Sequence, residues 1–265
     1  MGFKSILKRT NSMYIKTPGA KMLYLIKRRL ETSRDELVMH WFKNHMPAVI
    51  RGQEEAASAM RRHARRYIAT LFDTPLAYGN REISQSGASD LQWDGMAQLW
   101  WDEPLTRPAR PHGEPPVDSF QERAMPYVPW GTQEYVVLDG SEHLSAQPLS
   151  LNDPYPMTRS GFCRASFLVA ARPGTDFEAF FEHWLESHVA NVKSVMQQVG
   201  GFRYVVSHSL EPELEPFAGL AELYFQSARG LADYFETIEN DGMEQWVDGK
   251  RTLIFRGSTE MVGIP

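Results

Sequence analysis

The sequence predicts an α+β fold in which two ferredoxin-like βαββαβ repeats form one intramolecular, pseudo-dimeric α+β barrel. The first observation is a stretch that occurs twice, at residues 21–48 and 164–191: an apolar strand, a polar turn and an amphipathic helix carrying His-Trp-x-x-x-His. The second is its constant spacing, since His40 and His45 recur as His183 and His188, both 143 residues later. The third is that similar elements follow each copy in the same order.

The barrel follows from the exposed sheet faces of such repeats. A four-stranded sheet with helices on one face leaves its other face bare, and two such sheets in one chain can bury those faces against each other. We therefore expect helices on the outside and a ligand cavity within the barrel.

In the first repeat the helix has the clearest local signals. Ser33 and Glu36 form a capping box at its start, and Leu37, Trp41, His45 and Val49 recur every four residues as its buried stripe. The predicted strands of this repeat are residues 22–28, 67–72, 94–101 and 143–149, and a weaker helix is predicted near 119–127.

The second repeat gives the same order with clearer patterns. Its predicted strands are residues 164–171, 202–209, 218–226 and 252–256, and its predicted helices are 176–195 and 231–238. The predicted division of the chain is an N-terminal arm (1–20), repeat 1 (21–151) with a proline-rich insert (102–117), a linker (152–160) and repeat 2 (161–265). Five prolines exclude a helix or a central strand from the insert, which is either surface decoration or a lid.

Composition excludes several classes of function. The net charge of −5 argues against nucleic acid as a partner, since phosphate binding needs a basic surface. Cys163 is the single cysteine, so no intrachain disulfide forms, which fits a reducing compartment. No apolar run approaches the length of a membrane span, and the basic N-terminus lacks the apolar core of a secretory signal. We expect a cytoplasmic protein without membrane contact.

Several segments resemble the EthD-domain family of the dimeric α+β-barrel superfamily. In the first half they are LIKRRLETSRDELVMHWFKNHMP, RRYIATL and DGMAQLWWD, and in the second FEAFFEHWLESH, FRYVVSHSL and AGLAELYF. The resemblance implies the barrel fold, but relatives include proteins of ether degradation and aromatic polyketide processing, cyclases, isomerases, monooxygenases and haem enzymes. It also suggests a homodimer through exposed helices, which the sequence leaves open.

The two halves depart differently from the family pattern. The second strand of the second half keeps His208 where the first half has Leu71, and its third strand keeps Glu222 where the first half has Gln98. The first half instead keeps the family's His-x-Pro at His45. We infer one main site, biased to the second half.

Glu222 is the first candidate for chemistry. The third strands alternate, so Gln98 and Trp100, like Glu222 and Tyr224, should face the lumen. Burial there would raise the carboxyl pKa and suit a general acid or base. The alternative is that Glu222 pairs with Arg203 or another cation and only satisfies a buried charge.

The second candidate is His208. If the face shared by Tyr204 and His208 is the lumen, His208 lies within reach of Glu222. Tyr67 is the first-half equivalent of Tyr204. His45 and His188 either brace the core or reach into the barrel mouth. Five residues put the two histidines of each motif about 140° apart on an α-helix, so no metal pair is expected.

The leading hypothesis is a cofactor-independent lyase, isomerase or cyclase acting by proton transfer on a hydrophobic, aromatic or polyketide-like molecule. The predicted catalytic residues are His208, Glu222, His188, His45, Tyr204 and Tyr67, and the predicted substrate-binding residues are Gln98, Trp100, Tyr224, Arg66, Arg203 and Tyr24. The alternatives are a haem protein with His188 or His45 as axial ligand, and a non-catalytic binding protein for the same kind of molecule.

Overall fold

The computed structural model describes residues 13–76, 93–146 and 156–265. Most of the predicted N-terminal arm, much of the predicted linker and the last three residues of the predicted strand 143–149 lie outside these ranges. Within them, no helix is long and apolar enough to cross a membrane.

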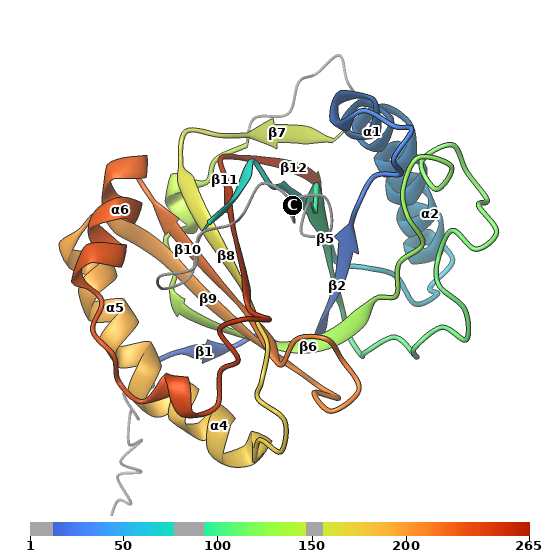
Figure 1. The fold of residues 1–265 in the computed structure, drawn as a ribbon. Coiled ribbons are helices and arrows are strands. Elements are labelled where there is room, and N and C mark those ends of the chain that lie inside the picture. Colours follow the sequence, from blue (N-terminus) through green and yellow to red (C-terminus); the bar gives the residue numbers. More distant parts are fainter. Residues whose placement is uncertain (1–12, 77–92, 147–155) are drawn as a thin grey trace, which may run out of the picture.

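The first half contains one four-stranded unit with its helices on the outside (Figure 1). Its elements are β1 (Ile15–Lys16), β2 (Ala20–Ile26), α1 (Arg34–His40), the π-helical turn η1 (Trp41–His45), α2 (Met46–Ser58), β3 (Arg66–Leu71), β4 (Thr74–Leu76), β5 (Gly95–Trp101), β6 (Trp130–Leu138) and the short 3-10 helix η3 (Ser141–His143). The Oγ of Ser33 accepts from the backbone N–H of Glu36 at 3.1 Å, so α1 has its predicted cap.

The second half repeats this arrangement. Its elements are β7 (Met157–Arg159), β8 (Cys163–Val169), α4 (Phe177–His183), the π-helical turn η4 (Trp184–His188), α5 (Val189–Gln198), β9 (Gly201–Ser209), β10 (Gly219–Phe225), α6 (Ala228–Thr237), the 3-10 helix η5 (Met243–Gln245), β11 (Leu253–Gly257) and β12 (Thr259–Ile264).

Both halves have the ferredoxin-like strand order, and together they close a barrel. The first unit runs β6-β2-β5-β3 and the second β11-β8-β10-β9, with antiparallel pairs throughout. At one junction between the units β9 pairs with β6. At the other junction β11 pairs with β4, and β12, which follows β11 in the chain, pairs with β3. The predicted tandem barrel is confirmed.

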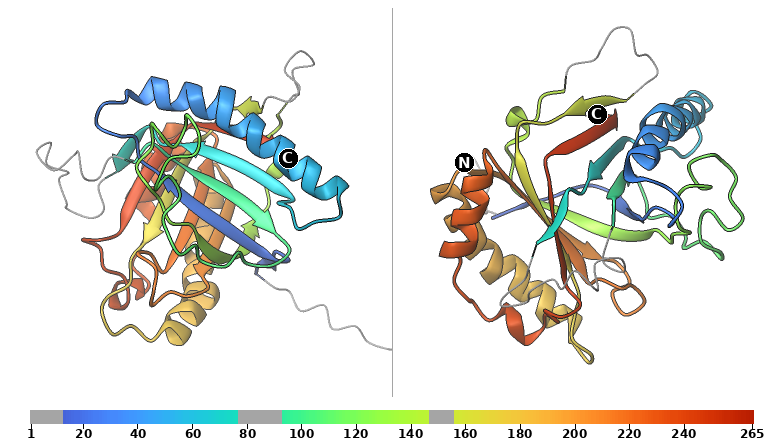
Figure 2. Two further views of the ribbon diagram at one scale, coloured as in Figure 1. Left: turned by 90° about the vertical axis from the view of Figure 1, so that its right-hand side faces the viewer. Right: turned by 45° about the horizontal axis from the view of Figure 1, so that its top comes forward.

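Helices cover opposite outer sides of this barrel (Figure 2). On the first side Trp41 and Leu37 pack against outward residues of β3 and β5, such as Ala69 and Leu99. On the second side Trp184 packs against the corresponding face of β9 and β10. The apolar outer faces of the strands and the helices that cover them thus form two helix–sheet cores.

Side chains fill the lumen in layers. One end is an apolar cluster that includes Leu23, Met96, Leu168, Leu220 and Phe255. The middle layer is polar and charged. At the other end Ile68, Trp100 and Val262 form one small apolar cluster, while Tyr224 packs with Leu144 and Phe162 in another.

Two element predictions in the first half are wrong. Residues 119–127 form turns rather than a helix, because this proline-flanked segment lies across the outer face of the first-half sheet. The fourth strand is Trp130–Leu138 rather than 143–149, since it must lie beside both β2 and β9 to join the two units. Its alternating burial marks one face turned to the lumen.

The repeated His-Trp-x-x-x-His motif interrupts each helix with a π-helical turn, residues Trp41–His45 and Trp184–His188. Hydrogen bonds in such a turn join residues five apart, so residues five apart come to one side of the helix. The 140° separation expected for His183 and His188 is therefore wrong, because it assumed α-helical geometry.

Candidate functional site

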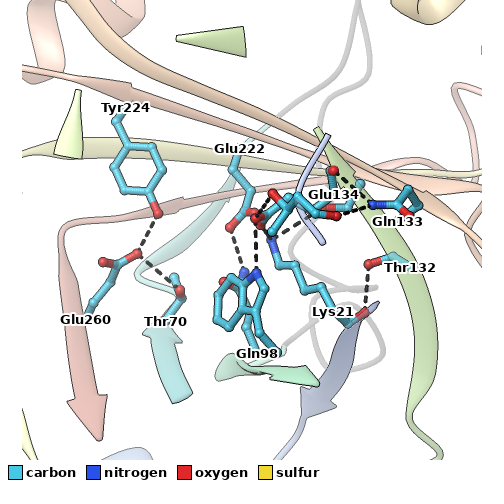
Figure 3. Close-up of polar contacts among 12 residues, drawn as sticks. Lys21, Thr70, Gln98, Thr132, Gln133, Glu134, Glu222, Tyr224 and Glu260 are labelled. Atoms are coloured by element: carbon cyan, nitrogen blue, oxygen red, sulfur yellow. Dashed lines mark hydrogen bonds and ion pairs between the residues drawn. The ribbon is translucent and has the colours of Figure 1, made fainter. Parts of the chain in front are cut away.

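The polar layer of the lumen is an ion-pair network joining the two halves (Figure 3). The ammonium group of Lys21 contacts the Oε2 atom of Glu222 and lies 3.0 Å from the Oε2 of Glu134. Gln98 Nε2 and Arg164 Nη2 each donate to Glu222 Oε1 at 2.6 Å. Trp100 Nε1 donates to Glu134 Oε1 at 3.0 Å. Both oxygens of the Glu222 carboxylate are thus occupied.

The network continues to Glu260 on β12. This carboxylate accepts from the hydroxyl of Tyr224 at 2.7 Å and from the Nε of Arg159 at 2.6 Å, and it contacts Arg164. Arg164 itself is fully buried and also contacts Thr70. The predicted lumen residues Gln98, Trp100, Glu222 and Tyr224 therefore lie together, but as members of one saturated cluster.

Glu222 does not have the raised pKa expected of a general acid. Burial acts in that direction, but the positive charges of Lys21 and Arg164 outweigh it and bring the pKa to about 2. At neutral pH the carboxylate is ionised and held by Lys21, Arg164 and Gln98, so it is a weak base. The alternative made from the sequence, a satisfied buried charge, describes this residue, with Lys21 and Arg164 as its cations.

The second strand of each unit, β3 or β9, has its tyrosine on the face away from the lumen, and His208 of β9 lies on that face too. This is opposite to the expectation. In β9, Tyr204 and His208 lie in the helix-side core, whereas the alternate residues Arg203 and Ser207 face inward. Tyr67 likewise packs against the helices and accepts a hydrogen bond from Trp41 Nε1 at 3.0 Å. His208 and Glu222 lie on opposite faces of the sheet and cannot act together.

His208 is a buried aromatic residue. Its ring stacks on Phe181 with centroids 4.1 Å apart and also contacts Trp184. Burial lowers the pKa of His208 to about 3, so the imidazole is neutral at physiological pH. The large ring fits a core position, which explains why it faces the helices.

The structure places His188 beside an acid that the sequence did not single out. Its Nδ1 lies 2.8 Å from the Oδ2 of Asp241, which also accepts from Asn191 Nδ2 at 2.8 Å. His183 Nε2 is 3.9 Å from the other oxygen. Gly242, with φ of 98°, makes the turn that presents Asp241, a conformation that residues other than glycine rarely adopt.

The tautomer of His188 follows from this contact. Burial raises the pKa of Asp241, but hydrogen bonds from His188 and Asn191 outweigh it and bring the pKa to about 2. An ionised carboxylate only accepts, so Nδ1 of His188 carries the hydrogen and the neutral ring has Nε2 as its free base.

A cavity of about 390 Å³ lies between the second-half sheet and its helices, and His188 and Asp241 line it. Its walls are mostly apolar and include Phe167, Val169 and Leu223. This volume is within the range of roughly 300–1,000 Å³ that small-molecule sites occupy. The candidate site is therefore outside the barrel lumen, contrary to the expectation, because charged side chains fill the lumen.

Two buried polar atoms belong to side chains that line this cavity. Trp184 Nε1 and the Tyr204 hydroxyl are neighbours, and a hydrogen-bonding contact from Trp184 acts to lower the pKa of Tyr204, but neither atom makes a hydrogen bond of normal geometry among the described residues. Burial raises the pKa of Tyr204 well above 10, so the hydroxyl stays protonated. In the first half the equivalent atoms of Trp41 and Tyr67 satisfy each other. The Trp184–Tyr204 contact is therefore looser than its first-half equivalent, and both N–H and O–H could turn to a ligand oxygen.

The first half has the same histidine–aspartate pair, but a side chain occupies the place that corresponds to the second-half cavity. His45 Nδ1 lies 2.9 Å from Asp118 Oδ2. Phe120 stacks on the His45 ring at 4.4 Å and contacts Trp41 at 5.4 Å. Its ring occupies the place that is open beside His188 and Trp184, so the two repeats have diverged as the sequence indicated.

The remaining predicted binding residues lie elsewhere. Tyr24 faces the outer side of the first-half sheet and contacts His112 and Tyr127 of the segment that covers it. Arg66 and Arg203 lie at the rim of the barrel, where Arg203 pairs with Asp139 at 2.7 Å. The structure does not bring these three residues to the second-half cavity.

The comparisons with known proteins agree with this asymmetry. Residues 172–250 match the EthD domain, and this range contains the π-helical turn, His188 and Asp241. The match lies within the second half of the chain and shows similarity to the EthD domain there. No curated protein matches the sequence.

Solved structures with similar folds cover almost the whole chain. An anthrone oxidase-like protein aligns with a TM-score of 0.50 and 11% identity, over 94% of this chain and 96% of its own. A haem-binding protein from Thermus thermophilus gives 0.40 and 11%, over 93% of each chain. A chlorite dismutase variant from Candidatus Nitrospira defluvii gives 0.39 and 8%, over 94% and 92%. At 11% identity, the likeness to the anthrone oxidase-like protein shows a shared fold and nothing more.

Replacing Glu222 tests the role of the lumen network. We expect Glu222→Gln to lower the free energy of unfolding by about 3–5 kcal/mol, because Lys21 and Arg164 lose their shared counter-charge inside the protein. Urea unfolding at neutral pH measures this change. The exposed Glu213→Gln is the control and should differ from wild type by less than about 0.5 kcal/mol. Equal stabilities for the two variants would contradict the assignment.

Acid should destabilise the protein through the same carboxylate. The pKa of Glu222 is about 2 in the folded protein, below its ordinary value of 4.5, so its contribution is complete above pH 4.5. This contribution is lost as pH falls from 4.5 towards 2, where the folded carboxylate finally takes up a proton. Unfolding free energies measured between pH 7 and pH 3 should fall below pH 4.5; a constant value down to pH 3 would refute this prediction.

Proposed function

We propose that the EthD-like second half binds a hydrophobic, aromatic or polyketide-like molecule in the cavity beside His188 and catalyses proton transfer on it without a cofactor. The observation that carries the proposal is the His188–Asp241 pair, which lines a mostly apolar cavity together with the loosely paired donors Trp184 and Tyr204. An apolar cavity with few convergent polar groups is the usual form of a small-molecule site.

His188 is the base in this mechanism. Asp241 fixes the proton on Nδ1, so Nε2 takes a proton from a carbon next to a ligand carbonyl. The electron pair of the broken C–H bond moves onto the carbonyl oxygen, giving an enolate. Tyr204 and Trp184 donate hydrogen bonds to that oxygen as its charge develops. Returning the proton from Nε2 to another carbon of the enolate completes an isomerisation. In a cyclisation the enolate carbon instead bonds to a second carbonyl carbon of the ligand, whose oxygen takes the proton from Nε2. In an elimination the enolate expels a leaving group from the β carbon, and that group departs with the proton.

This assignment keeps His188 and Tyr204 from the residues chosen from the sequence and omits Glu222, His208, His45 and Tyr67. Glu222 is saturated by donors, His208 faces a packed core, and His45 lies beneath Phe120. Tyr67 already accepts from Trp41. The shared fold of the anthrone oxidase-like protein does not decide the reaction, so the proposal depends on the cavity itself.

Hydrogen–deuterium exchange tests the base without knowledge of the natural substrate. We expect the wild-type protein to accelerate exchange of the acidic C–H hydrogens of a cyclic aryl ketone such as α-tetralone in D₂O, followed by mass spectrometry. His188→Gln should lose roughly 10²–10⁴-fold of that rate, and Tyr204→Phe should also reduce it.

His45→Gln is the matched control, since it removes the equivalent histidine of the filled first half and should leave the exchange rate unchanged. Equal losses in His45→Gln and His188→Gln would contradict the assignment. Binding of the ketone without any accelerated exchange would favour the non-catalytic binding protein instead.

Haem is a second candidate ligand because of one contact. A histidine that ligates a metal usually donates its other ring N–H to a carboxylate, and His188 does so to Asp241. His188 would hold the iron through Nε2, and the apolar walls would contact the macrocycle. Bound haem would supply redox chemistry. Among the described residues, no group of three or more acidic, histidine or cysteine side chains could hold a bare metal ion.

A hemin titration separates the two candidates. The cofactor-free proposal predicts no Soret band that depends on His188 when hemin is added to the purified protein. A one-to-one complex whose band is lost in His188→Ala and kept in His45→Ala would establish haem as the ligand and overturn the cofactor-free mechanism.

A further inference from the structure

Three arginines converge at one rim of the barrel, on the lumen side. Arg66 lies opposite Trp100 in the β3–β5 register, Arg203 opposite Tyr224 in β9–β10, and Arg159 opposite Glu260 in β12–β7. They therefore lie in the layer of Trp100 and Tyr224, at the end opposite the apolar cluster of Leu23 and Phe255. This rim is separate from the second-half cavity, whose residues line the other face of the sheet.

Arg66 differs from the other two in making no ion pair with any described carboxylate, although Glu134 lies near enough to act on its pKa. Arg159 pairs with Glu260 and Arg203 with Asp139. No carboxylate of the described residues makes an ion pair with Arg66, and its buried Nε has no hydrogen-bond partner. Its guanidinium instead lies over the Trp100 ring, 4.9 Å from the centroid. That contact stabilises the charge but leaves the Nε–H donor unused.

The local charge balance favours an anion here. Among the residues that the structure describes in the rim and the network beneath it, positive side chains outnumber negative ones. The positive side chains are Lys21, Arg66, Arg159, Arg164 and Arg203, and the negative ones are Glu134, Asp139, Glu222 and Glu260. Burial and the nearby charge of Arg203 lower the pKa of Arg66, with Glu134 opposing them. An uncompensated charge at a partly buried site is costly, and a bound anion would remove that cost.

We propose that this rim is a binding site for a small organic anion, whose carboxylate or phosphate group is held by Arg66 with Arg203 beside it. The planar guanidinium of Arg66 presents parallel N–H groups that match either oxyanion. Apolar side chains flank the arginines, with Ile68 and Val262 on one side and Phe162 and Phe202 on the other. These surfaces suit the apolar body of an amphipathic ligand. Arg66 is partly exposed, so the ligand can reach it from solvent.

Calorimetric titrations with sodium benzoate and with inorganic phosphate, at constant ionic strength set by chloride, test the site. We expect saturable binding of at least one anion to the wild-type protein and about tenfold or greater weakening in Arg66→Gln. Benzoate binding alone would identify a carboxylate ligand with an apolar body, and phosphate binding alone a phosphorylated one. The control is Arg65→Gln, which changes the adjacent, exposed arginine that pairs with Asp102 and should bind as wild type.

A thermal-unfolding series covers the case in which a titration signal is small. Wild-type protein should melt at a higher temperature in benzoate or phosphate than in chloride, whereas Arg66→Met should show no such difference. Arg66→Met should also be at least as stable as wild type in chloride, because it removes an unpaired charge. No binding to wild type, or equal anion effects in wild type and Arg66→Met, would overturn the proposal. Neither result depends on proton transfer at His188.

Discussion

Charge compensation inside the barrel is the constraint on which the structure depends. The closed ring of strands brings inward side chains from both halves into one enclosed layer, and many of them are ionic. Each ion then needs a partner, since an unpaired charge in a protein interior is strongly destabilising. Lys21 and Gln98 of the first half meet Glu222 of the second, and Thr70 meets Arg164 and Glu260. The network therefore fixes how the two halves face each other.

Because the polar groups are used inside, the outer faces of the same strands are free to be apolar. Each outer face packs against a helix whose π-helical turn places a tryptophan on the sheet and a histidine near the edge. The two copies of this core differ most at the ring of Phe120, which fills the first copy. The second copy has Met243 on the corresponding segment and retains a cavity. After the duplication the two halves have thus diverged, so that the first has a filled core and the second has a cavity large enough for a ligand.

The fold could be predicted from the sequence because its determinants are local and repeated. Strand alternation, helix caps and the 143-residue spacing specify two units, and the alternation of β5 and β10 correctly placed Gln98 and Glu222 inside. The same reasoning would have placed Arg66 and Arg203 inside, because Tyr67, Ala69 and Leu71 form the more apolar face. The prediction that Tyr204 and His208 face the lumen was wrong because it considered the chemistry of these side chains and not the size of their rings, which suits a packed core.

The site itself depends on contacts that no local pattern reveals. Asp241 is 53 residues from His188, and only the turn at Gly242 brings it to the π-helical turn. The pKa of Glu222 could not be read from burial alone, because its value depends on Lys21, which is 201 residues away in the chain. A signal was nonetheless present: an aspartate follows the motif in both halves, at Asp118 and Asp241, and each contacts its histidine.

The closure of the barrel has a consequence for how the chain folds during synthesis. The edge of the first unit at β3 pairs with β12, so Thr70 meets Glu260, which lies 190 residues further along the chain. Until β12 leaves the ribosome, β3 presents an unpaired strand edge, and Glu260 is absent from the network around Arg164. The nascent protein is therefore open along one seam while the whole second half is being made. Such an edge favours pairing with other strands, so this interval is when the protein most needs protection from aggregation.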